Sequence, residues 1–444
     1  SRMVSAWATG NYTWNDIYLA DFSVRFDGSS DFGSKQRWAP FFSGGLGVNI
    51  HNYEFLKGNE MVNKLKVRAS YGRTGKASFP AYAATTMYEA LFDEWYATGF
   101  GAVLKALGNN NLTWEKTDKF NVGIEMQFLN RRLTVDADYY HDKTIDLVND
   151  VSLSQTSGFS SYKDNMGEVL NQGFELQVRG EVFRNRDWLV ALWGNMAHNK
   201  NKILKISDSQ RAYNQRVKEF YENIVNEEYG RYNSKYGVPI SQYEEGQSLT
   251  SIWAVKSLGI DPTTGKEIFL NRDGSVSDTW NATQEVAVGN TEPKFNGSIG
   301  FNAAYKQWSL FAAFQYEWGG QEYNQTLVDR VENARIQYQN VDLRVLTDRW
   351  KQPGDIAQFK DIKNADSATM PTSRFVQDKA YLRLSALTLS YDFNREWIKK
   401  YLGMNMLRLE ASTRDFINWN SIRQERGLSY PKSWTVDFSI KAQF

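Results

Sequence analysis

Three histidines and one pair of aspartates are the residues whose types could carry acid–base or metal chemistry. His51, His141 and His198 lie far apart, and no two of them have the short spacing of metal ligands. We expect them to be isolated polar positions near strand ends. Asp136 and Asp138 stand two residues apart in an alternating stretch, so both would face one side of a strand. Two such carboxylates can form a catalytic pair, but the surrounding alternation favours a polar lining.

The composition and the motifs exclude several further kinds of site and partner. The chain of 444 residues has no cysteine, which excludes a disulfide scaffold and a thiolate metal site. No nucleophile elbow, phosphate loop or pair of glycosidase carboxylates is identifiable in the sequence. The formal net charge is +1, so no basic field argues for a nucleic-acid partner. The sequence therefore predicts neither an enzyme nor a resident cofactor.

Two polar turns and one aromatic-rich stretch remain as candidate binding features. Residues 261–265 and 271–274 carry the Asp, Asn and Gly of tight turns, and their oxygens could bind calcium in a loop. Aromatic side chains recur between residues 213 and 243, where they could stack on sugar rings or peptide side chains, dock a lid protein, or pack the loop itself. The candidates for contact with cargo or lid are Tyr213, Tyr221, Tyr229, Tyr232, Tyr236 and Tyr243.

The elements that would position these residues are long strands with two unlike faces. In residues 434–444 apolar and polar side chains alternate up to the last position. The run matches the roughly 9–11 residues that a tilted strand needs to cross a bilayer, although a half-buried soluble strand would alternate in the same way. We interpret it as the strand that closes a barrel, because an open sheet edge in lipid leaves backbone groups unpaired. Its apolar face carries Trp434, Val436, Phe438, Ile440 and Phe444.

The connections between the expected strands are sorted by length. Short turns near residues 15, 52, 131, 185, 306 and 399 alternate with long loops near residues 30, 88, 157, 241, 340 and 424. Short turns on one side and long loops on the other are typical of an outer-membrane barrel with its long loops outside. Residues 326–350 have helical spacing within one long loop, and the strand alternation slips near residues 386–387, where we expect a bulge. With about thirteen membrane strands, the sequence predicts an all-β transmembrane antiparallel β-barrel with long extracellular loops.

Hydropathy and the start of the sequence agree with this architecture. No apolar run approaches the roughly 20 residues of a membrane helix, and the mean hydropathy is −0.56. Membrane strands in which apolar and polar residues alternate do not give a high mean hydropathy. Aromatic residues make up 15% of the chain, as the interfacial girdles of a barrel require. No signal peptide opens the sequence, and an odd strand number is unusual in bacterial barrels, so we expect the back part of a longer precursor.

Several short motifs are spread over the whole chain. They are DGSSDFG at residues 27–33, LKVRASYG at 65–72, GEV at 167–169 with NQGFEL at 171–176, GIDPTTG at 259–265, DRW at 348–350 and YLRL at 381–384. In this order, and only in combination, these motifs resemble the SusC-like (SusC/RagA) branch of TonB-dependent outer-membrane transporters.

The resemblance implies that residues 1–444 are the C-terminal part of a 22-stranded barrel, with the plug domain and the TonB box outside this sequence. It further implies a nutrient importer for oligosaccharides or peptides in the outer membrane of a Gram-negative bacterium. The implied partners are a SusD-like lid lipoprotein, TonB acting through the missing N-terminal part, outer-membrane lipid, and the barrel-assembly machinery during insertion.

Two alternatives stay open from the sequence alone. The chain could be a SusC-fold structural or scaffold subunit of a larger outer-membrane assembly or secretion complex, with stable partners other than a lid lipoprotein. It could also be a soluble β-rich binding protein, which would be extracted without detergent. The sequence names no cargo, because aromatic loop residues suit glycans and peptides alike.

Overall fold

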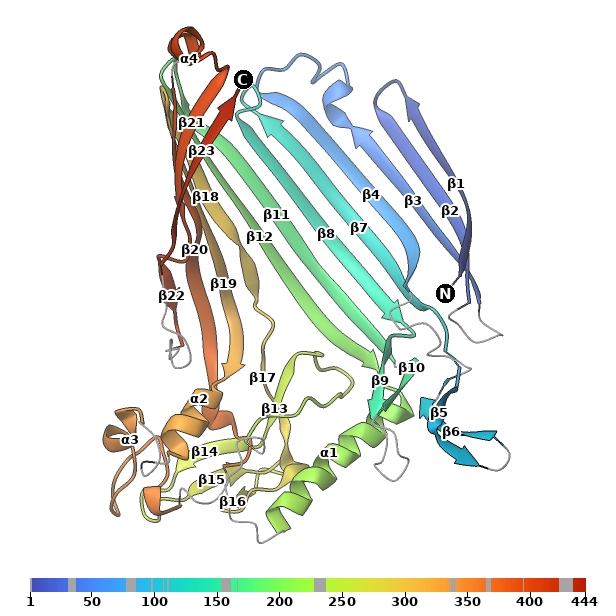
Figure 1. Cartoon of the computed structure of the whole chain (residues 1–444), viewed down its shortest axis with the longest axis vertical. Coiled ribbons are helices and arrows are strands. Elements are labelled where there is room, and N and C mark those ends of the chain that lie inside the picture. The colour runs from blue at the N-terminus through green and yellow to red at the C-terminus, as the bar shows by residue number, and fades with distance from the viewer. Residues whose placement is uncertain are drawn as a thin grey trace. The chain divides into compact units, whose positions relative to one another are not determined.

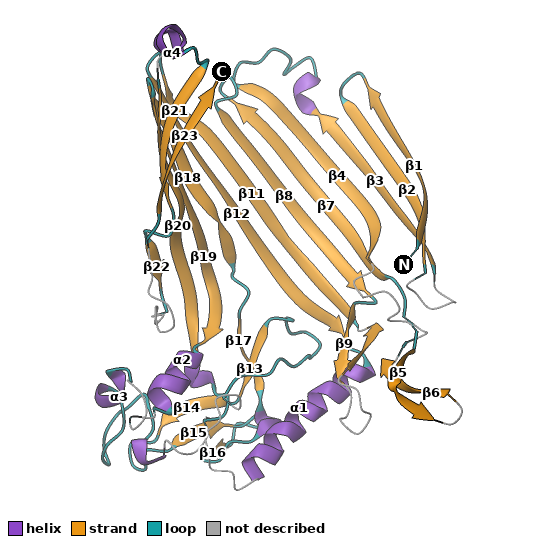
Figure 2. Cartoon of the chain, viewed as in Figure 1, coloured by secondary structure: helices purple, strands orange, loops and turns teal. Residues whose placement is uncertain are grey.

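The described part of the chain consists mainly of β-strands, drawn in orange in Figure 2. No helix within it is long and apolar enough to cross a membrane. The computed structural model describes residues 2–30, 37–76, 85–96, 99–106, 108–109, 112–152, 161–165, 167–226, 237–334, 336, 341–364, 369–393, 395–422 and 434–444.

Most strands belong to one antiparallel sheet of 14 strands. The hydrogen-bonded order follows the chain as β1-β2-β3-β4-β7-β8-β11-β12-β18-β19-β20-β21-β23, and β22 pairs with β20 beside this path. This agrees with the predicted count of about thirteen membrane strands. The strands are β1 Met3–Trp14, β2 Tyr18–Ser29, β3 Trp38–Asn49, β4 Val62–Lys76, β7 Glu115–Phe128, β8 Leu133–Ile145, β11 Glu168–Arg184, β12 Trp188–Lys205, β18 Phe295–Tyr305, β19 Trp308–Tyr323, β20 Val376–Asp392, β21 Met406–Thr413, β22 Asn418–Asn420 and β23 Val436–Gln443.

The long connections contain small sheets and short helices of their own. The paired strands are β5 Met87–Tyr96 with β6 Gly99–Ala106, β9 Val148–Ser152 with β10 Ser161–Asn165, β13 Ser251–Ala254 with β17 Val286–Asn290, and β14 Lys256–Ile260 with β15 Glu267–Leu270 and β16 Val276–Ser277. The helices are α1 Asp208–Asn226, α2 Gln325–Leu327, α3 Arg344–Thr347 and α4 Arg395–Leu402. A π-helical turn spans Val328–Glu332, and 3-10 turns span Ile50–Asn52, Ala282–Gln284, Ile362–Asn364 and Ser373–Phe375.

The chain divides into two compact units, and each is described by itself. The first contains β1 to β10, and the second contains β18 to β23 together with the small sheets β13 to β17, whose strands can be followed in Figure 1. The first unit comprises Ser1–Leu176, Lys200–Gln215 and Tyr243–Leu249, and the second comprises Gln177–Asn199, Arg216–Gln242 and Thr250–Phe444.

Tight turns join the long strands at several of the predicted positions, but the connections predicted to be short near residues 52 and 399 run over residues 50–61 and 393–405 and are longer than the predicted long loop at residues 30–37. Asn15 and Asp16, between β1 and β2, have φ of 52° and 55°, which is the backbone of a two-residue hairpin turn that matches the twist of the strands. Lys306, between β18 and β19, has φ of 51°. Asn130 and Arg131, between β7 and β8, also have positive φ. The short turns predicted near residues 15, 131 and 306 are therefore confirmed.

The predicted bulge is also confirmed, one residue before its expected place. In the pairing of β19 with β20, Ala313 lies opposite Ala386, but the next residue of β19, Phe314, lies opposite Leu384. Ser385 is therefore the extra residue in β20, and its hydroxyl donates a hydrogen bond to the carbonyl of Ala313 at 3.0 Å. One unpaired residue reverses the side chain alternation beyond it, which is the slip that the sequence shows.

The last strand is shorter than the sequence predicts. β23 runs over Val436–Gln443 and pairs with β21, so Trp434 and Phe444 flank it. Every second side chain of the strand is apolar and exposed: Phe438 is 82% exposed and Ile440 is 72% exposed. Among the described residues β1 and β23 each have a single sheet neighbour. The role of β23 as the closing strand stays a prediction.

Three loop predictions need correction. Residues 326–350 do not form one helical segment: the α2 turn continues into the π-helical turn, which ends at Glu332, and the next described helix, α3, begins at Arg344. The helical spacing instead reflects burial, because Leu327, Val328, Val331 and Val345 pack in one cluster with Phe359 and Phe375. The long loop expected near residue 88 contains the β5–β6 hairpin, and the aromatic-rich stretch begins inside the helix α1.

Candidate functional site

The loops of the second unit form an assembly that joins two distant parts of the chain. β13 to β17 come from the connection between β12 and β18, whereas α2 and α3 come from the connection between β19 and β20. The backbone of Val255 links the two connections: its N–H donates to the carbonyl of Pro371 at 3.2 Å, and its carbonyl accepts from the N–H of Ser373 at 2.9 Å. Trp280 adds a bond from its indole N–H to the same Pro371 carbonyl at 3.0 Å.

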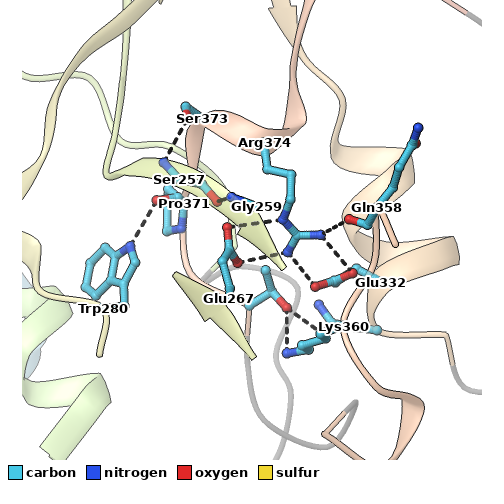
Figure 3. A network of polar contacts seen from close by, with 12 residues as sticks. Ser257, Gly259, Glu267, Trp280, Glu332, Gln358, Lys360, Pro371, Ser373 and Arg374 are labelled. Atoms are coloured by element: carbon cyan, nitrogen blue, oxygen red, sulfur yellow. Dashed lines mark hydrogen bonds and ion pairs between the residues drawn. The ribbon is translucent and has the colours of Figure 1, made fainter. Parts of the chain in front are cut away.

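Arg374 is the centre of a buried ionic network in this assembly (Figure 3). One guanidinium nitrogen, Nη2, lies 2.8 Å from Glu267 Oε2 and 2.6 Å from Glu332 Oε1. Nη1 donates to the carbonyl of Gln358 at 2.7 Å. The side chains of all three ionic residues are at most 10% exposed. Burial alone lowers the pKa of Arg374, but Glu267 and Glu332 outweigh it and hold that pKa above its usual value.

Two further cations are buried beside the network. Arg349 donates to the carbonyls of Lys360 at 2.8 Å and Glu332 at 3.0 Å. Lys360 Nζ donates to the hydroxyl of Thr369 at 2.9 Å. Burial lowers the pKa of both Arg349 and Lys360. The carboxylates and carbonyls therefore hold three cations in a space from which water is excluded, and this fixes the loops of the second unit to one another.

The turn at residues 261–265 packs on Trp350. The indole N–H of Trp350 donates to the carbonyl of Pro262 at 2.8 Å. Gly265 has φ of +68°, and a Cβ at this position would lie 2.5 Å from Trp350 Cε3. Only glycine fits both the backbone conformation and this close approach. Two of the motifs noted in the sequence, at residues 259–265 and 348–350, therefore contact each other directly.

The carboxylates of the two candidate calcium turns are engaged by their own turns. Asp261 accepts hydrogen bonds from the N–H of Thr263 at 2.9 Å and the hydroxyl of Thr264 at 2.6 Å, and the Thr264 bond lowers the pKa of Asp261. Asp273 accepts from the N–H and hydroxyl of Ser275 at 2.9 and 2.7 Å. Among the described residues, no group of three or more His, Asp or Glu side chains is arranged to hold a metal ion. Calcium binding at these turns stays a prediction.

The aromatic candidates between residues 213 and 243 do not form one exposed surface. Tyr221 is fully buried, donates to the carbonyl of Val238 at 2.9 Å, and packs edge-on against Trp280 at a centroid distance of 5.4 Å. Tyr213 and Tyr243 are partly exposed and lie 5.9 Å apart in the first unit. For Tyr221, packing of the loop itself is the role that these contacts support. Tyr229, Tyr232 and Tyr236 lie outside the described residues.

A pocket of about 360 Å³ opens next to Trp280. The walls come from α1, from the turn between β15 and β16, from β16 and from the loop after it, and they contribute one carboxylate, side-chain amides and hydroxyls. The polar lining is uncharged except for that carboxylate, so the pocket can exchange hydrogen bonds with a neutral polar group. The residues that supply these groups are Glu222, Asn271, Ser277, Thr279, Asn281 and Gln284.

Glu285 is a buried acid close in sequence to this pocket. Its side chain is 1% exposed, one carboxylate oxygen accepts a hydrogen bond from Gln242, and the other oxygen, Oε1, has no partner. Burial raises the pKa of Glu285 to about 7, although Gln242, Lys218 and Arg272 oppose the rise. Near neutral pH the carboxyl group is therefore divided between its neutral and charged forms.

The first unit carries an ionic ladder across three neighbouring strands. Lys64 of β4 lies 2.6 Å from Glu125 of β7, and Arg68 of β4 lies 2.7 Å from Asp138 of β8. Glu125 is also the cross-strand neighbour of Asp136. Asp138 is thus engaged with an arginine, which supports the polar lining over a catalytic pair of carboxylates.

The three histidines occupy separate places, as expected. The ring Nδ1 of His51 lies 3.1 Å from the carbonyl of Leu65, and that of His141 lies 3.2 Å from Gln172 Oε1. His198 contacts the carbonyl of Lys294 and lies 5.5 Å from the ring of Phe295. None of these contacts brings two of the histidines together.

The buried network around Arg374 is the feature that sequence reasoning missed. Glu267 and Glu332 stand 107 and 42 residues from Arg374, and no local pattern links the three positions. Arg349 belongs to the DRW motif and Glu332 to the stretch with helical spacing at residues 326–350, but neither pattern indicates an ionic contact. Charged residues within apolar loop segments indicate buried ionic contacts, but a single sequence does not show which of these residues contact each other.

Comparison with known proteins gives one family and several relatives. The family described as TonB dependent receptor-like, beta-barrel matches residues 1–412. TonB-dependent receptor P3 of Formosa agariphila is 27% identical over 426 residues, which are 94% of this chain and 41% of that protein. TonB-dependent receptor SusC of Bacteroides thetaiotaomicron is 33% identical over 217 residues, which are 47% of this chain and 21% of SusC. The chain thus spans less than half the length of these relatives.

Solved structures share the fold. The RagAB peptide importer in its open-open state superposes with a TM-score of 0.79 at 23% identity, covering 100% of this chain and 47% of that one. The structure of the RagAB peptide transporter gives a TM-score of 0.77 at 24% identity, covering 95% of this chain and 44% of that one. At this level of identity the likeness concerns the fold.

Proposed function

Because this chain belongs to the family of TonB-dependent receptor-like β-barrels, we propose that it forms the barrel part of an importer for oligosaccharides or peptides. The chain is an outer-membrane β-barrel protein of a Gram-negative bacterium and not an enzyme, as its family and its receptor relatives establish. The proposed partners are a SusD-like lid lipoprotein at the extracellular mouth and TonB, which would act on a part of the protein outside residues 1–444.

The observation that carries the proposal is the match to this family over residues 1–412. The described strands support the proposal because their two faces differ in chemistry. In the first unit Lys64, Arg68, Glu125 and Asp138 form the ionic ladder, whereas Tyr71 of β4, which belongs to the alternate set of residues, is 48% exposed. A barrel that conducts polar cargo needs a charged inner face and an apolar face toward lipid.

The loop assembly of the second unit suits a contact surface for cargo or lid. The network around Arg374 makes the assembly rigid, so that binding does not have to order it. The pocket beside Trp280 offers one carboxylate together with amides and hydroxyls. Such groups hydrogen-bond to sugar hydroxyls and to peptide backbone alike, and for this reason the proposal keeps both cargo classes.

The proposal is tested by purifying the intact protein from detergent-solubilised outer membranes and identifying its partners by mass spectrometry. We expect one SusD-like lipoprotein at near-equal amounts, and peptides from a plug domain upstream of residue 1. Uptake of labelled oligosaccharides and peptides by whole cells is then measured with and without an uncoupler of the proton gradient, which supplies the energy for TonB. An importer loses accumulation of its cargo in the presence of the uncoupler.

Two outcomes would contradict the proposal. Recovery of a larger set of assembly or secretion proteins, without a lid lipoprotein and without uncoupler-sensitive uptake, would support the scaffold subunit. Recovery of the chain from the soluble fraction without detergent would contradict the barrel as well. Deletion of the protein serves as the control for uptake, because a parallel importer for the same cargo would leave accumulation unchanged.

A further inference from the structure

Four aromatic side chains of the second unit stand at one level of the large sheet. Trp188 at the start of β12 pairs with Tyr305 at the end of β18, Tyr305 pairs with Trp308 at the start of β19, and Trp308 pairs with Tyr391 near the end of β20. Directly opposed residues of antiparallel strands point to the same face. The rings contact one another, with centroids 4.4 Å apart for Trp188 and Tyr305 and 4.8 Å apart for Trp308 and Tyr391.

This aromatic row has the composition that is typical of a membrane–water interface. Trp188, Tyr305 and Trp308 are between 38% and 48% exposed, so their rings are available to the surroundings of the sheet. Trp and Tyr gather at the interfaces of membrane barrels because their rings are apolar and their N–H or O–H groups are polar. The row lies beside short connections, namely the turn at Lys306 and the turn between β11 and β12.

The helix α4 continues the row beyond the end of β20. The ring of Tyr391 lies 5.0 Å from Phe393, Phe393 lies 6.2 Å from Trp397, and Trp397 lies 5.8 Å from Tyr401. Trp397 and Tyr401 are four residues apart in the helix, so they stand on the same side of it. In Figure 1, α4 lies between the end of β20 and the start of β21, both in the second unit.

The helix has three chemically distinct sides. Ile398 is 1% exposed and faces the protein. Trp397 and Tyr401 are 48% and 64% exposed and form an aromatic side. Lys399 and Lys400 are exposed in the last turn. The Nζ atom of Lys400 lies 5.3 Å from the centroid of the Tyr401 ring, which places one cation at the border of the aromatic side.

We propose that α4 is an interfacial helix that binds the phospholipid headgroup layer of the outer membrane. Trp397 and Tyr401 enter the boundary between headgroups and acyl chains, and Lys399 and Lys400 contact lipid phosphates. The two lysines complement an anionic surface, and the aromatic side is continuous with the row on the strands. An amphipathic helix with Trp and Tyr on one side and Lys on the other is the arrangement that lies in the plane of an interface. The inference depends on the location of the barrel in the membrane and not on the proposed transport.

Residues 1–444 contain no cysteine, so a single introduced cysteine, with any cysteine in the rest of the intact protein replaced by serine, allows a direct test by site-directed spin labelling. Tyr401→Cys places the label on the aromatic side of α4, and Lys399→Cys is the matched control on the polar side of the same helix. The intact protein is reconstituted into vesicles of phosphatidylethanolamine and phosphatidylglycerol. We expect the label at position 401 to be accessible to oxygen and protected from a water-soluble nickel chelate. The label at position 399 should be several-fold more accessible to the chelate than to oxygen.

Two results would overturn the proposal. Equal access of the chelate to both labels would mean that α4 stands in water. Protection of the label at position 401 from both oxygen and the chelate would mean that a protein covers this side instead of lipid.

A second variant tests the role of the lysines. Lys399→Gln combined with Lys400→Gln should lower the apparent affinity for phosphatidylglycerol, measured by native mass spectrometry, by about fivefold for each lysine. The effect should fade with added salt. Lys351→Gln, in the long connection between β19 and β20 at the other end of the strands, serves as the control for the loss of a positive charge away from α4. An unchanged lipid affinity of the double variant would exclude the contact with lipid phosphate.

Discussion

At the scale of single residues, the charge of Arg374 decides the stability of the loop assembly. Arg374→Gln leaves Glu267 and Glu332 buried without their cation, at a cost of about 3–5 kcal/mol in local stability, because an uncompensated buried charge is strongly destabilising. The measurement is hydrogen exchange of the β14 and β15 amides in the intact protein. Exchange there should accelerate by at least about a hundredfold, since local opening exposes these amides.

The control for Arg374 is an ion pair of the same chemistry on the surface. Arg211 lies 2.7 Å from Asp208, but their side chains are 56% and 98% exposed. Surface pairs of this kind contribute about 0–1 kcal/mol, so Arg211→Gln should leave the exchange of β14 and β15 unchanged. Equal effects of the two substitutions would show that the network around Arg374 has no special role.

Glu285 makes local stability depend on pH in an unusual direction. Burial raises the pKa of its carboxyl group from 4.5 to about 7 in the folded state. Between these values the folded state binds more protons than the unfolded state, so the free energy of local unfolding falls as pH rises from about 4.5 to about 7. The total loss is about 3 kcal/mol, at 1.36 kcal/mol for each pKa unit. Hydrogen exchange of the β17 amides at several pH values, corrected for intrinsic exchange, measures it.

Two substitutions separate the effect of Glu285 from other titrating groups. Glu285→Gln removes the charge and should abolish the pH dependence while it stabilises β17 at pH 8. Glu222→Gln, at an exposed carboxylate of the pocket wall, should retain the dependence of the original protein. A pH profile that persists in Glu285→Gln would assign the titration to another group.

For single residues, the sequence predicts a role only where a short motif or the spacing to similar residues indicates one. Gly265 and Arg349 stand in short motifs that are recognisable without a structure, and the isolation of the histidines followed from their spacing. The network of Arg374 with Glu267 and Glu332 could not be predicted, because its members come from separate connections. The burial of Tyr221 was one of several outcomes left open, since its aromatic type alone does not show whether it packs inside the protein or contacts a partner.

At the scale of elements, the turn at residues 261–265 depends on the size of its last residue. Gly265→Ala places a methyl group 2.5 Å from Trp350 Cε3 at a φ of +68°. Overpacking of this kind costs about 1–3 kcal/mol, in addition to the backbone strain of a left-handed alanine. We expect faster hydrogen exchange of the Gly354 amide, which donates to the carbonyl of Pro262, and a changed fluorescence of Trp350.

Gly274 provides a matched control for this contact. It also has a positive φ, +84°, but a Cβ there meets no atom within 4 Å. Gly274→Ala therefore introduces the backbone strain alone. The difference between the two substitutions measures the contact with Trp350, and equal losses of stability would show that the conformation of the turn matters and its packing does not.

The sequence predicts the strands better than the segments between them. The alternation near residues 386–387 located the bulge at Ser385 because a strand has a strict period of two. By contrast, the helical spacing of residues 326–350 indicated a helix where the chain forms two short helical segments. Buried apolar residues of a loop can have a helical spacing even where the segment does not form helical hydrogen bonds along its whole length. The sequence did not predict the helix α1, because the aromatic residues between 213 and 243 indicated a binding loop.

At the scale of the whole molecule, the alternation of short and long connections pointed to the fold class, although the connections at residues 50–61 and 393–405 are longer than the predicted long loop at residues 30–37. This alternation depends on the topology of a membrane barrel and not on any single residue. The strands of the large sheet are hydrogen-bonded in the order in which they occur in the chain. Because neighbouring strands are antiparallel, successive connections lie alternately at the two ends of the strands. A single sequence could therefore predict the fold class and the strand number, while the interior of the long loops depended on contacts between distant segments.

The same alternation of short and long connections predicts which positions a reagent reaches from outside the cell. Ile356, in the long connection between β19 and β20, is 95% exposed, and Arg186 is exposed in the short turn between β11 and β12. Ile356→Cys should react with a membrane-impermeant maleimide on intact cells, because long loops of outer-membrane barrels face the exterior. Arg186→Cys should react only after the outer membrane has been permeabilised. Residues 1–444 contain no other cysteine that could contribute to the signal, and any cysteine in the rest of the intact protein is replaced by serine. Labelling of Arg186→Cys on intact cells, with Ile356→Cys protected, would reverse the orientation, and with it the place of α4 and the side from which a lid or cargo could reach the loop assembly.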